Sequence, residues 1–185
     1  MIDWNKTYGS GVDFRAISQR DIDTFLKYIP SMSKKNRSLD VGCGTGQLTR
    51  ELWHRGFAPT GIDISETAIA LAKSYTLLEG TEIIYKIFDL ETQHASDFTN
   101  STFELITCKL VYAFINDKVT FLRNVASLLD KNGIFVILTP LLDQVPKEKK
   151  HIAVDYDKTM TELTRFFNVE TKKDDIQGLF ICQPI

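Results

Sequence analysis

Short apolar runs alternate along this chain with segments in which apolar residues recur every three or four positions. The runs have the length and composition of β-strands and lie at residues 38–41, 60–64, 82–88, 104–108 and 133–138. The run at 133–138 is nearly continuous and rich in β-branched residues, which is typical of a strand covered on both faces.

The segments between the runs have helical period. They predict helices at residues 18–29, 47–55, 66–75 and 118–129, and a last helix that begins at Asp155 or Asp157 and carries Met160, Leu163 and Phe167. Ser65 and Asp117 stand directly before two of these segments, where a side-chain oxygen caps the first backbone N–H groups. Because strands alternate with helices, the pattern predicts βαβ units and a parallel sheet.

The end of the chain departs from this alternation. Two extended runs, 169–176 and 179–185, are separated only by Gln177 and Gly178, which leaves no room for a helix between them. Consecutive strands joined by so short a connection pair antiparallel, so a hairpin is expected at the edge of the sheet.

Composition narrows the class of protein further. The chain has 185 residues, of which 43% are hydrophobic and 25% charged, and 22 Lys and Arg against 24 Asp and Glu give a net charge of −2. This length predicts one domain over 1–185, in which residues 1–36 hold an N-terminal segment and the first helix and residues 37–185 form the core sheet. The near-neutral charge gives no general attraction for DNA or for an anionic membrane.

The lack of a recognisable targeting segment and the spacing of the cysteines predict a cytoplasmic protein. No apolar run approaches the roughly 20 residues of a membrane span, and residues 1–6 do not resemble a signal peptide. The three cysteines are far apart and are expected to be reduced thiols. Histidines and cysteines show no metal-ligand spacing, so no metal site is expected.

The most informative segment is the glycine-rich stretch at 39–46, which leaves a predicted strand and enters a predicted helix. Its spacing is G-x-G-x-G, with Asp40 two residues before Gly42. The dinucleotide fingerprint G-x-G-x-x-G requires glycine where this chain has Gln47, and the phosphate-loop motif is absent from this stretch. Glycines here let the backbone pass close to a ligand at the carboxyl end of a strand.

This stretch resembles motif I of the class I S-adenosylmethionine-dependent methyltransferases, and the resemblance extends over roughly 39–185. It implies an α/β, Rossmann-like sheet of seven strands in the order 3-2-1-4-5-7-6, with the last strand antiparallel and helices on both faces. It also implies S-adenosyl-L-methionine as the cofactor.

The resemblance assigns cofactor-binding roles to particular positions. Asp63, expected at a partly open strand end, would accept hydrogen bonds from the two ribose hydroxyls, and Ile64 would lie against the adenine face. Asp89 would take the adenine amino group, and Leu90 would supply a backbone N–H and an apolar contact. The remaining positions of the site would be Asp40, Gly42, Cys43, Gly44 and Gly46 in the glycine loop and Cys108 and Lys109 at the methionine end.

The acceptor side departs from the family pattern. Ala113 and Phe114 replace a Glu-His pair that is common in small-molecule members, which removes a ready general base. Tyr112 and His151 are the remaining catalytic candidates, each with a structural or solvated alternative. Tyr8 and Arg15 precede the first predicted helix and are either lid residues over the cofactor or anchors of a packed segment.

The expected function is in-line methyl transfer to a small-molecule acceptor. A methyl sulfonium is already activated, so the protein mainly aligns the reacting atoms. Modification of RNA or protein, and a non-catalytic S-adenosylmethionine-binding protein that works with a partner, are the alternatives. A nicotinamide-binding oxidoreductase is disfavoured by Gln47.

Overall fold

The computed structural model describes residues 2–11, 22, 27, 36–81, 83–99, 101–173 and 177–185. The chain forms two compact units, Met1–Asp89 and Leu90–Ile185. Its seven strands follow the order β3-β2-β1-β4-β5-β7-β6, which confirms the predicted sheet. The interpretation of residues 1–185 as one domain stays a prediction.

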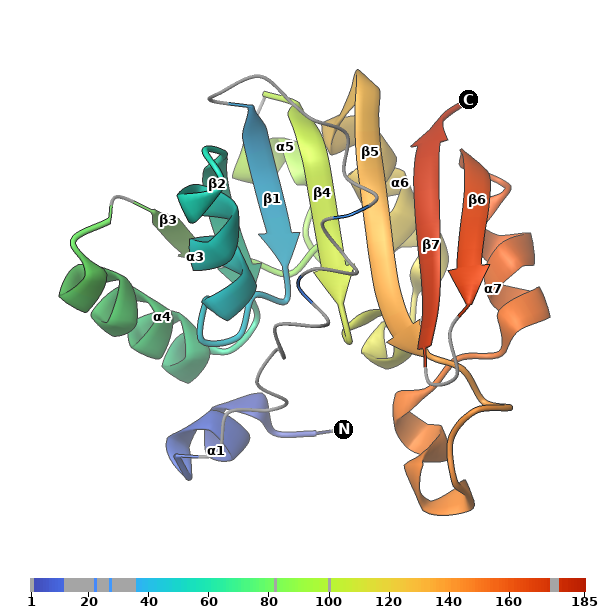
Figure 1. The fold of residues 1–185 in the computed structure, drawn as a ribbon, viewed down its shortest axis with the longest axis horizontal. Helices are drawn as coiled ribbons and strands as arrows, with labels where there is room; N and C mark the ends of the chain where they lie inside the picture. Colours follow the sequence, from blue (N-terminus) through green and yellow to red (C-terminus); the bar gives the residue numbers. More distant parts are fainter. Residues whose placement is uncertain are drawn as a thin grey trace. The chain divides into compact units, whose positions relative to one another are not determined.

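The first unit contains three parallel strands, β1 (Arg37–Val41), β2 (Ala58–Asp63) and β3 (Ile84–Ile87), with β2 between the other two. Helix α3 (Gln47–His54) packs on β1 and β2, and α4 (Glu66–Glu79) packs on β2 and β3 (Figure 1). A short helix, α1 (Trp4–Gly9), packs on α4. The predicted helix at 18–29 lies outside the described residues except for Ile22 and Lys27, which are both helical.

Helix α4 is longer than the predicted segment 66–75. Ser65 caps its first turn as expected, because its side chain accepts a hydrogen bond from Ala68 N. The helix ends at Gly80, whose left-handed φ of 69° lets its N–H reach the carbonyl of Leu77. Leu77 and Leu78 are more than four-fifths exposed, so they do not continue the buried apolar face that predicted the rest of the helix.

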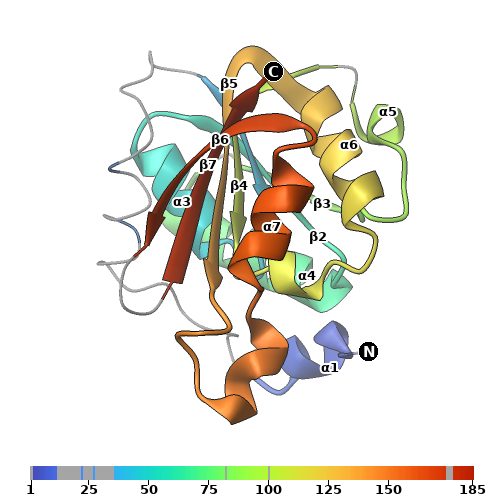
Figure 2. The same cartoon turned by 90° about the vertical axis from the view of Figure 1, so that its right-hand side faces the viewer.

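The second unit contains β4 (Phe103–Lys109), β5 (Leu129–Pro140), β6 (Phe167–Lys173) and β7 (Gln177–Pro184). Strands β4 and β5 are parallel, and β7 pairs antiparallel with both β5 and β6. Helices α6 (Lys118–Leu128) and α7 (Tyr156–Leu163) lie on one face of these strands (Figure 2). Shorter helical segments are α5 (Ala95–Phe98), η1 (Tyr112–Phe114) and η2 (Lys147–Ile152).

Two predictions near the chain end are wrong. Helix α7 ends at Leu163, and Phe167 begins β6 instead of continuing the helix, because its ring packs against Phe135 at a centroid distance of 5.8 Å. Gln177 and Gly178 are not the hairpin turn but the first residues of β7. A Cβ at position 178 would lie 2.9 Å from Leu141 Cδ2, so this glycine marks close packing.

No helix in the described part of the chain is long and apolar enough to cross a membrane.

Gly133 in β5 offers a test of the second unit's packing. A Cβ there would lie 2.9 Å from the carbonyl oxygens of Asp130 and Phe103, and backbone atoms cannot move aside cheaply. We expect Gly133→Ala to reduce the free energy of unfolding, measured with urea, by about 1–3 kcal/mol. Gly9→Ala, where nothing lies within 4 Å, is the control and should cost nothing. Equal stability of the two variants would contradict this packing.

Candidate functional site

The glycine loop connects β1 to α3 in the conformation that its three glycines permit. Gly42, Gly44 and Gly46 have φ values of 67°, 54° and 79°, all in the left-handed region that other residues avoid. The N–H groups of Gly42 and Cys43 both donate to Ile62 O, at 2.8 and 2.9 Å. The loop is therefore anchored to the end of β2.

Two tyrosines pack against this loop. A Cβ on Gly44 would lie 2.7 Å from the hydroxyl of Tyr8, and a Cβ on Gly46 would collide with the hydroxyl of Tyr85. Tyr85 is buried, accepts a hydrogen bond from Thr76 Oγ1 at 3.1 Å and donates to Gly46 O at 3.5 Å. Burial raises its pKa, so the hydroxyl remains a donor. Sequence analysis missed Tyr85, because an aromatic residue inside a strand is an ordinary core residue.

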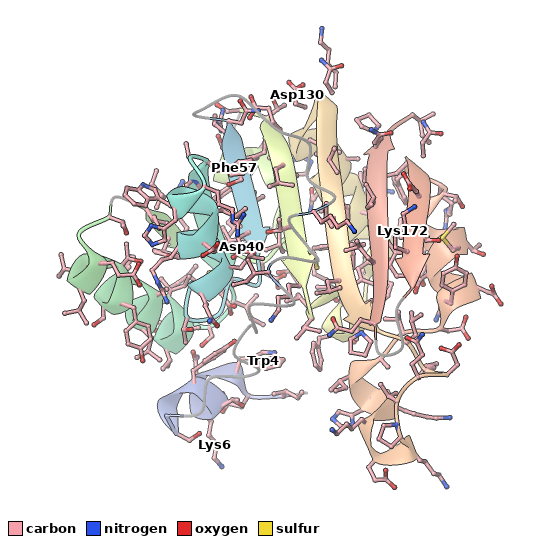
Figure 3. All side chains as sticks on the ribbon, in the orientation of Figure 1. Trp4, Lys6, Asp40, Phe57, Asp130 and Lys172 are labelled. Atoms are coloured by element: carbon pink, nitrogen blue, oxygen red, sulfur yellow. The ribbon has the colours of Figure 1, made fainter. Side chains whose placement is uncertain are left out.

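Asp40 binds the helix that follows the loop. The residue is buried, and its Oδ2 accepts a hydrogen bond from Thr49 Oγ1 at 2.6 Å (Figure 3 labels Asp40). Because Thr49 belongs to α3, this contact ties β1 to the helix on the other side of the glycine loop. The structure thus gives Asp40 a positioning role in the loop, and its predicted contribution to ligand binding stays a prediction.

Asp63 stands at the end of β2 beside the loop. Its Oδ2 accepts a hydrogen bond from Gly44 N at 2.9 Å, and its Oδ1 accepts one from Ser65 N at 2.8 Å. The expectation of a partly open strand end is wrong, because Asp63 is only 7% exposed. Burial raises the pKa of this carboxyl, while the backbone N–H groups of Ser65, Gly44 and Ile64 oppose that shift. A carboxylate has about four acceptor positions, so each oxygen retains capacity for a ligand hydroxyl.

Of the residues predicted to meet the adenine, Ile64 directly follows β2, Asp89 follows β3, and Leu90 begins the second unit. Ile64 is 53% exposed, which makes it an apolar surface directly beside the carboxylate. Phe88 N donates to Asp63 O at 3.1 Å. The residue that follows β3 is therefore bonded to the last residue of β2. Asp89 is partly exposed, and Leu90 is buried. Their contacts with a ligand stay predictions.

Helix α1 is docked on the same region of the first unit. Asn5 Oδ1 accepts hydrogen bonds from Ser65 Oγ at 2.8 Å and from Thr67 N at 3.2 Å, which adds a second cap to α4. Tyr8 is buried and lies against Gly44. Tyr8 therefore packs beside the loop, Arg15 lies outside the described residues, and the lid over the cofactor stays a prediction.

In the second unit, the end of β4 carries an unusual backbone. Cys108 is fully buried and Lys109 is partly exposed. Leu110, which follows them, has φ of 59°, and its N–H donates to Leu138 O at 2.7 Å. A left-handed branched residue is strained, and such strain is often held at functional sites. The predicted cofactor contacts of Cys108 and Lys109 stay predictions.

The structure argues against Tyr112 as a general base. Its ring is fully buried in η1, and its hydroxyl donates to Glu162 Oε2 at 3.0 Å. Burial, followed by the charge of Glu162, raises the pKa of Tyr112 far above its usual range. Lys118 Nζ lies 4.8 Å from the ring centroid and donates to the carbonyls of Tyr112 and Ile115, which fixes η1.

His151 lies on η2 and is exposed. Its Nδ1 donates to Glu148 O at 2.9 Å, a local contact within the same short helix. This is the solvated alternative that the sequence left open, and a catalytic role stays a prediction.

The three cysteines lie in the interior of the protein. None of the three forms a disulfide, and all are buried. Burial, and then the charges of Asp40 and Asp63, raise the pKa of the Cys43 thiol, which therefore stays neutral. Within the described ranges, no three His, Cys, Asp or Glu side chains gather as metal ligands would.

Comparison with known proteins identifies relatives of one kind. A family model described as a methyltransferase domain matches residues 32–180. The ubiquinone biosynthesis O-methyltransferase of Aeromonas salmonicida (strain A449) is 33% identical over 103 residues, which is 56% of this chain and 42% of that protein. The protein of the same name from Coxiella burnetii (strain Dugway 5J108-111) is 34% identical over 112 residues, 58% of this chain and 46% of that protein. The chain therefore spans less than half the length of these curated relatives.

Solved structures share the fold. The PH0226 protein of Pyrococcus horikoshii OT3 superposes with a TM-score of 0.79 at 17% identity, covering 100% of both chains. The N-methyltransferase NodS of Bradyrhizobium japonicum WM9 superposes with a TM-score of 0.73 at 20% identity, covering 94% of this chain and 99% of NodS. Identities this low support the fold alone.

The raised pKa of Asp63 predicts an unusual pH dependence of stability. Between the ordinary value of 3.8 and the raised folded value, the folded protein holds a proton that the unfolded chain has released. The contribution of Asp63 to stability is therefore fully present below 3.8 and is lost as pH rises through the folded pKa. We expect the unfolding free energy of the wild type, relative to Asp63→Asn, to fall as pH rises through this window in urea titrations. If this difference in unfolding free energy instead grows as the pH rises, the pKa of Asp63 is lowered in the folded protein.

Proposed function

We propose that this chain, which belongs to the class I S-adenosylmethionine-dependent methyltransferase family, binds S-adenosyl-L-methionine at the glycine loop and transfers its methyl group to a small-molecule acceptor. The observation that carries the proposal is the Asp63 carboxylate. It is buried beside the loop, oriented by two backbone N–H groups, and has acceptor positions left for a pair of hydroxyls.

The residues of the first unit fit such a nucleotide. The left-handed glycines bring backbone, not side chains, to the surface of the loop, where a ligand needs close approach. Asp63 would hold the ribose, and the exposed apolar side chain of Ile64 would cover one face of the base. Asp89 would recognise the adenine edge, and the roles that the family resemblance gives to Leu90, Cys108 and Lys109 of the second unit stay predictions.

When bound, S-adenosyl-L-methionine would supply a methyl group on a positively charged sulfur. An electron pair of the acceptor would bond to the methyl carbon in line as the carbon–sulfur bond breaks, and S-adenosylhomocysteine would leave. The protein's task is then to orient both partners and exclude water. Tyr112, whose buried hydroxyl donates to Glu162, is not arranged as a general base, and a catalytic role of the exposed His151 stays a prediction. The proposed chemistry therefore depends on alignment, with Tyr8 and the rest of α1 covering the loop side of the site.

The proposal of a small-molecule acceptor is supported by the names of relatives. The curated relatives are ubiquinone biosynthesis O-methyltransferases, and NodS is an N-methyltransferase. Both oxygen and nitrogen acceptors therefore belong in a test. A screen with radiolabelled methyl donor should show transfer into a metabolite extract. Label found only in added RNA or protein would instead favour the macromolecular alternative.

Calorimetric titration tests the cofactor directly. The wild type should bind S-adenosylmethionine and S-adenosylhomocysteine and show no binding of NAD. Asp63→Ala should weaken binding of S-adenosylhomocysteine by on the order of 1.5–3 kcal/mol, the range for hydrogen bonds to a charged group. Because Asp63 also holds two backbone amides, the variant should lose thermal stability as well.

The matched control is Asp157→Ala, which removes an exposed carboxylate from α7 in the second unit. It should leave cofactor affinity unchanged. Tight binding of NAD, or unaltered affinity of a folded Asp63→Ala variant, would overturn the assignment of this site.

A further inference from the structure

Arg50 is a charged residue in the first turn of α3, and its side chain is only 12% exposed. Its Nη1 donates to Thr45 O in the glycine loop at 2.7 Å. Its Nε lies 2.9 Å from Oε1 of Glu79, the last residue of α4. The guanidinium carbon lies 5.6 Å from the centroid of the Tyr75 ring, which is within the range of a cation–π contact. One guanidinium therefore connects the glycine loop to the last turn of α4.

The contacts of Arg50 suit the chemistry of a guanidinium. A charge that is largely removed from water needs an opposite charge nearby, and Glu79 supplies it. Because the guanidinium is a planar fork with five N–H donors, it can bond a carboxylate and a carbonyl at fixed angles and stack on a ring at the same time. An ammonium at this position would keep the charge but lose the fork and the stacking.

The carbonyl that Arg50 binds lies at the most adaptable part of the loop. Thr45 stands between Gly44 and Gly46, which both have left-handed φ values. Glycine backbone has many accessible conformations, so the peptide unit between Thr45 and Gly46 keeps one orientation only where bonds hold it. Gly46 N on this unit donates to Cys43 O at 2.9 Å, and Thr45 O accepts from Arg50. The peptide unit is therefore held on both of its sides.

We propose that Arg50 is a positioning residue that holds the glycine loop, and through it the Asp63 carboxylate, in the arrangement that receives the cofactor. This inference rests on the proposed function, in which the loop and Asp63 meet the ligand. The connection is short, because Thr45 directly follows Gly44, whose N–H donates to Asp63 Oδ2 at 2.9 Å. A rotation of the loop peptide would move this donor and release one oxygen of the carboxylate.

Hydrogen exchange tests the loop without any ligand. The exchange rates of the Gly44 and Gly46 amides are measured by NMR on the full chain and compared with those of the β2 amides. In Arg50→Gln the two loop amides should exchange at least tenfold faster than in the wild type, relative to β2. The reason is that the variant lacks the charged donor that holds Thr45 O.

Calorimetric titration with S-adenosylhomocysteine tests the consequence for binding. Arg50→Gln should weaken binding at least tenfold. Arg50→Lys, which keeps the charge without the planar fork, should lie between this variant and the wild type in both measurements. The lysine variant also provides the test should the glutamine variant fail to fold.

Two controls separate positioning from charge and from stability. Arg55→Gln removes the same charge from the end of α3, where Arg55 Nε lies 2.8 Å from Glu51 Oε1, and should change neither loop exchange nor affinity. Leu52→Ala removes a fully buried side chain from α3. It should lower the free energy of unfolding and leave the affinity of the folded protein unchanged.

The outcomes distinguish this inference from the proposed function. If the wild type binds S-adenosylhomocysteine, and folded Arg50 variants bind as tightly or leave the loop exchange unchanged, the role of Arg50 is overturned and the cofactor assignment stands. If the wild type does not bind, the proposed function fails. The exchange measurement, which needs no ligand, then still decides whether Arg50 holds the loop.

Discussion

A buried carboxylate next to a loop of left-handed glycines is the constraint on which the first unit depends. Removing the Asp63 charge from water is unfavourable, and the backbone N–H groups of Gly44 and Ser65 offset part of that cost. Both donors lie on segments that must be held in place, the loop after β1 and the start of α4. The contacts of Tyr85 with the loop and of Asn5 with the cap of α4 supply that support.

The same arrangement explains why the site is rigid before any ligand is considered. Each oxygen of Asp63 already accepts a hydrogen bond from a backbone N–H, so a ligand hydroxyl meets a carboxylate whose orientation is set. Preorganisation of this kind reduces the entropy lost on binding. In the second unit, the side chain of Asn124 on α6 holds the turn at 90–95 through hydrogen bonds to Leu90 O, Gln93 O and Ala95 N.

Sequence reasoning succeeded where a local pattern carries the information. The alternation of runs predicted strands joined by helices, the family resemblance predicted the strand order, and Ser65 and Asp117 cap the helices they precede. Sequence reasoning failed where the role of a residue depends on contacts with residues far away in the sequence. Gly178 is of a residue type typical of turns, but it lies in β7, where Leu141 leaves no room for a side chain. Phe167 follows the helical spacing, but it pairs with β7 as a residue of β6.

The candidate site shows the same division. The glycine spacing and Asp63 could be predicted because they form a local motif, but the burial of Asp63 and the support from Tyr85 and Asn5 arise only from folding. Tyr112 looked like a pocket residue beside β4, yet its hydroxyl is bonded to Glu162, which lies 50 residues further along the chain. No sequence window contains both partners.

A crystal structure of the complex with S-adenosylhomocysteine tests the central claim most directly. The account predicts both ribose hydroxyls within hydrogen-bond distance of the Asp63 carboxylate, with the bonds from Gly44 N and Ser65 N retained at close to their present 2.9 and 2.8 Å. A complex in which the ribose is held elsewhere, or in which the carboxylate must release either backbone N–H to reach it, would contradict the account.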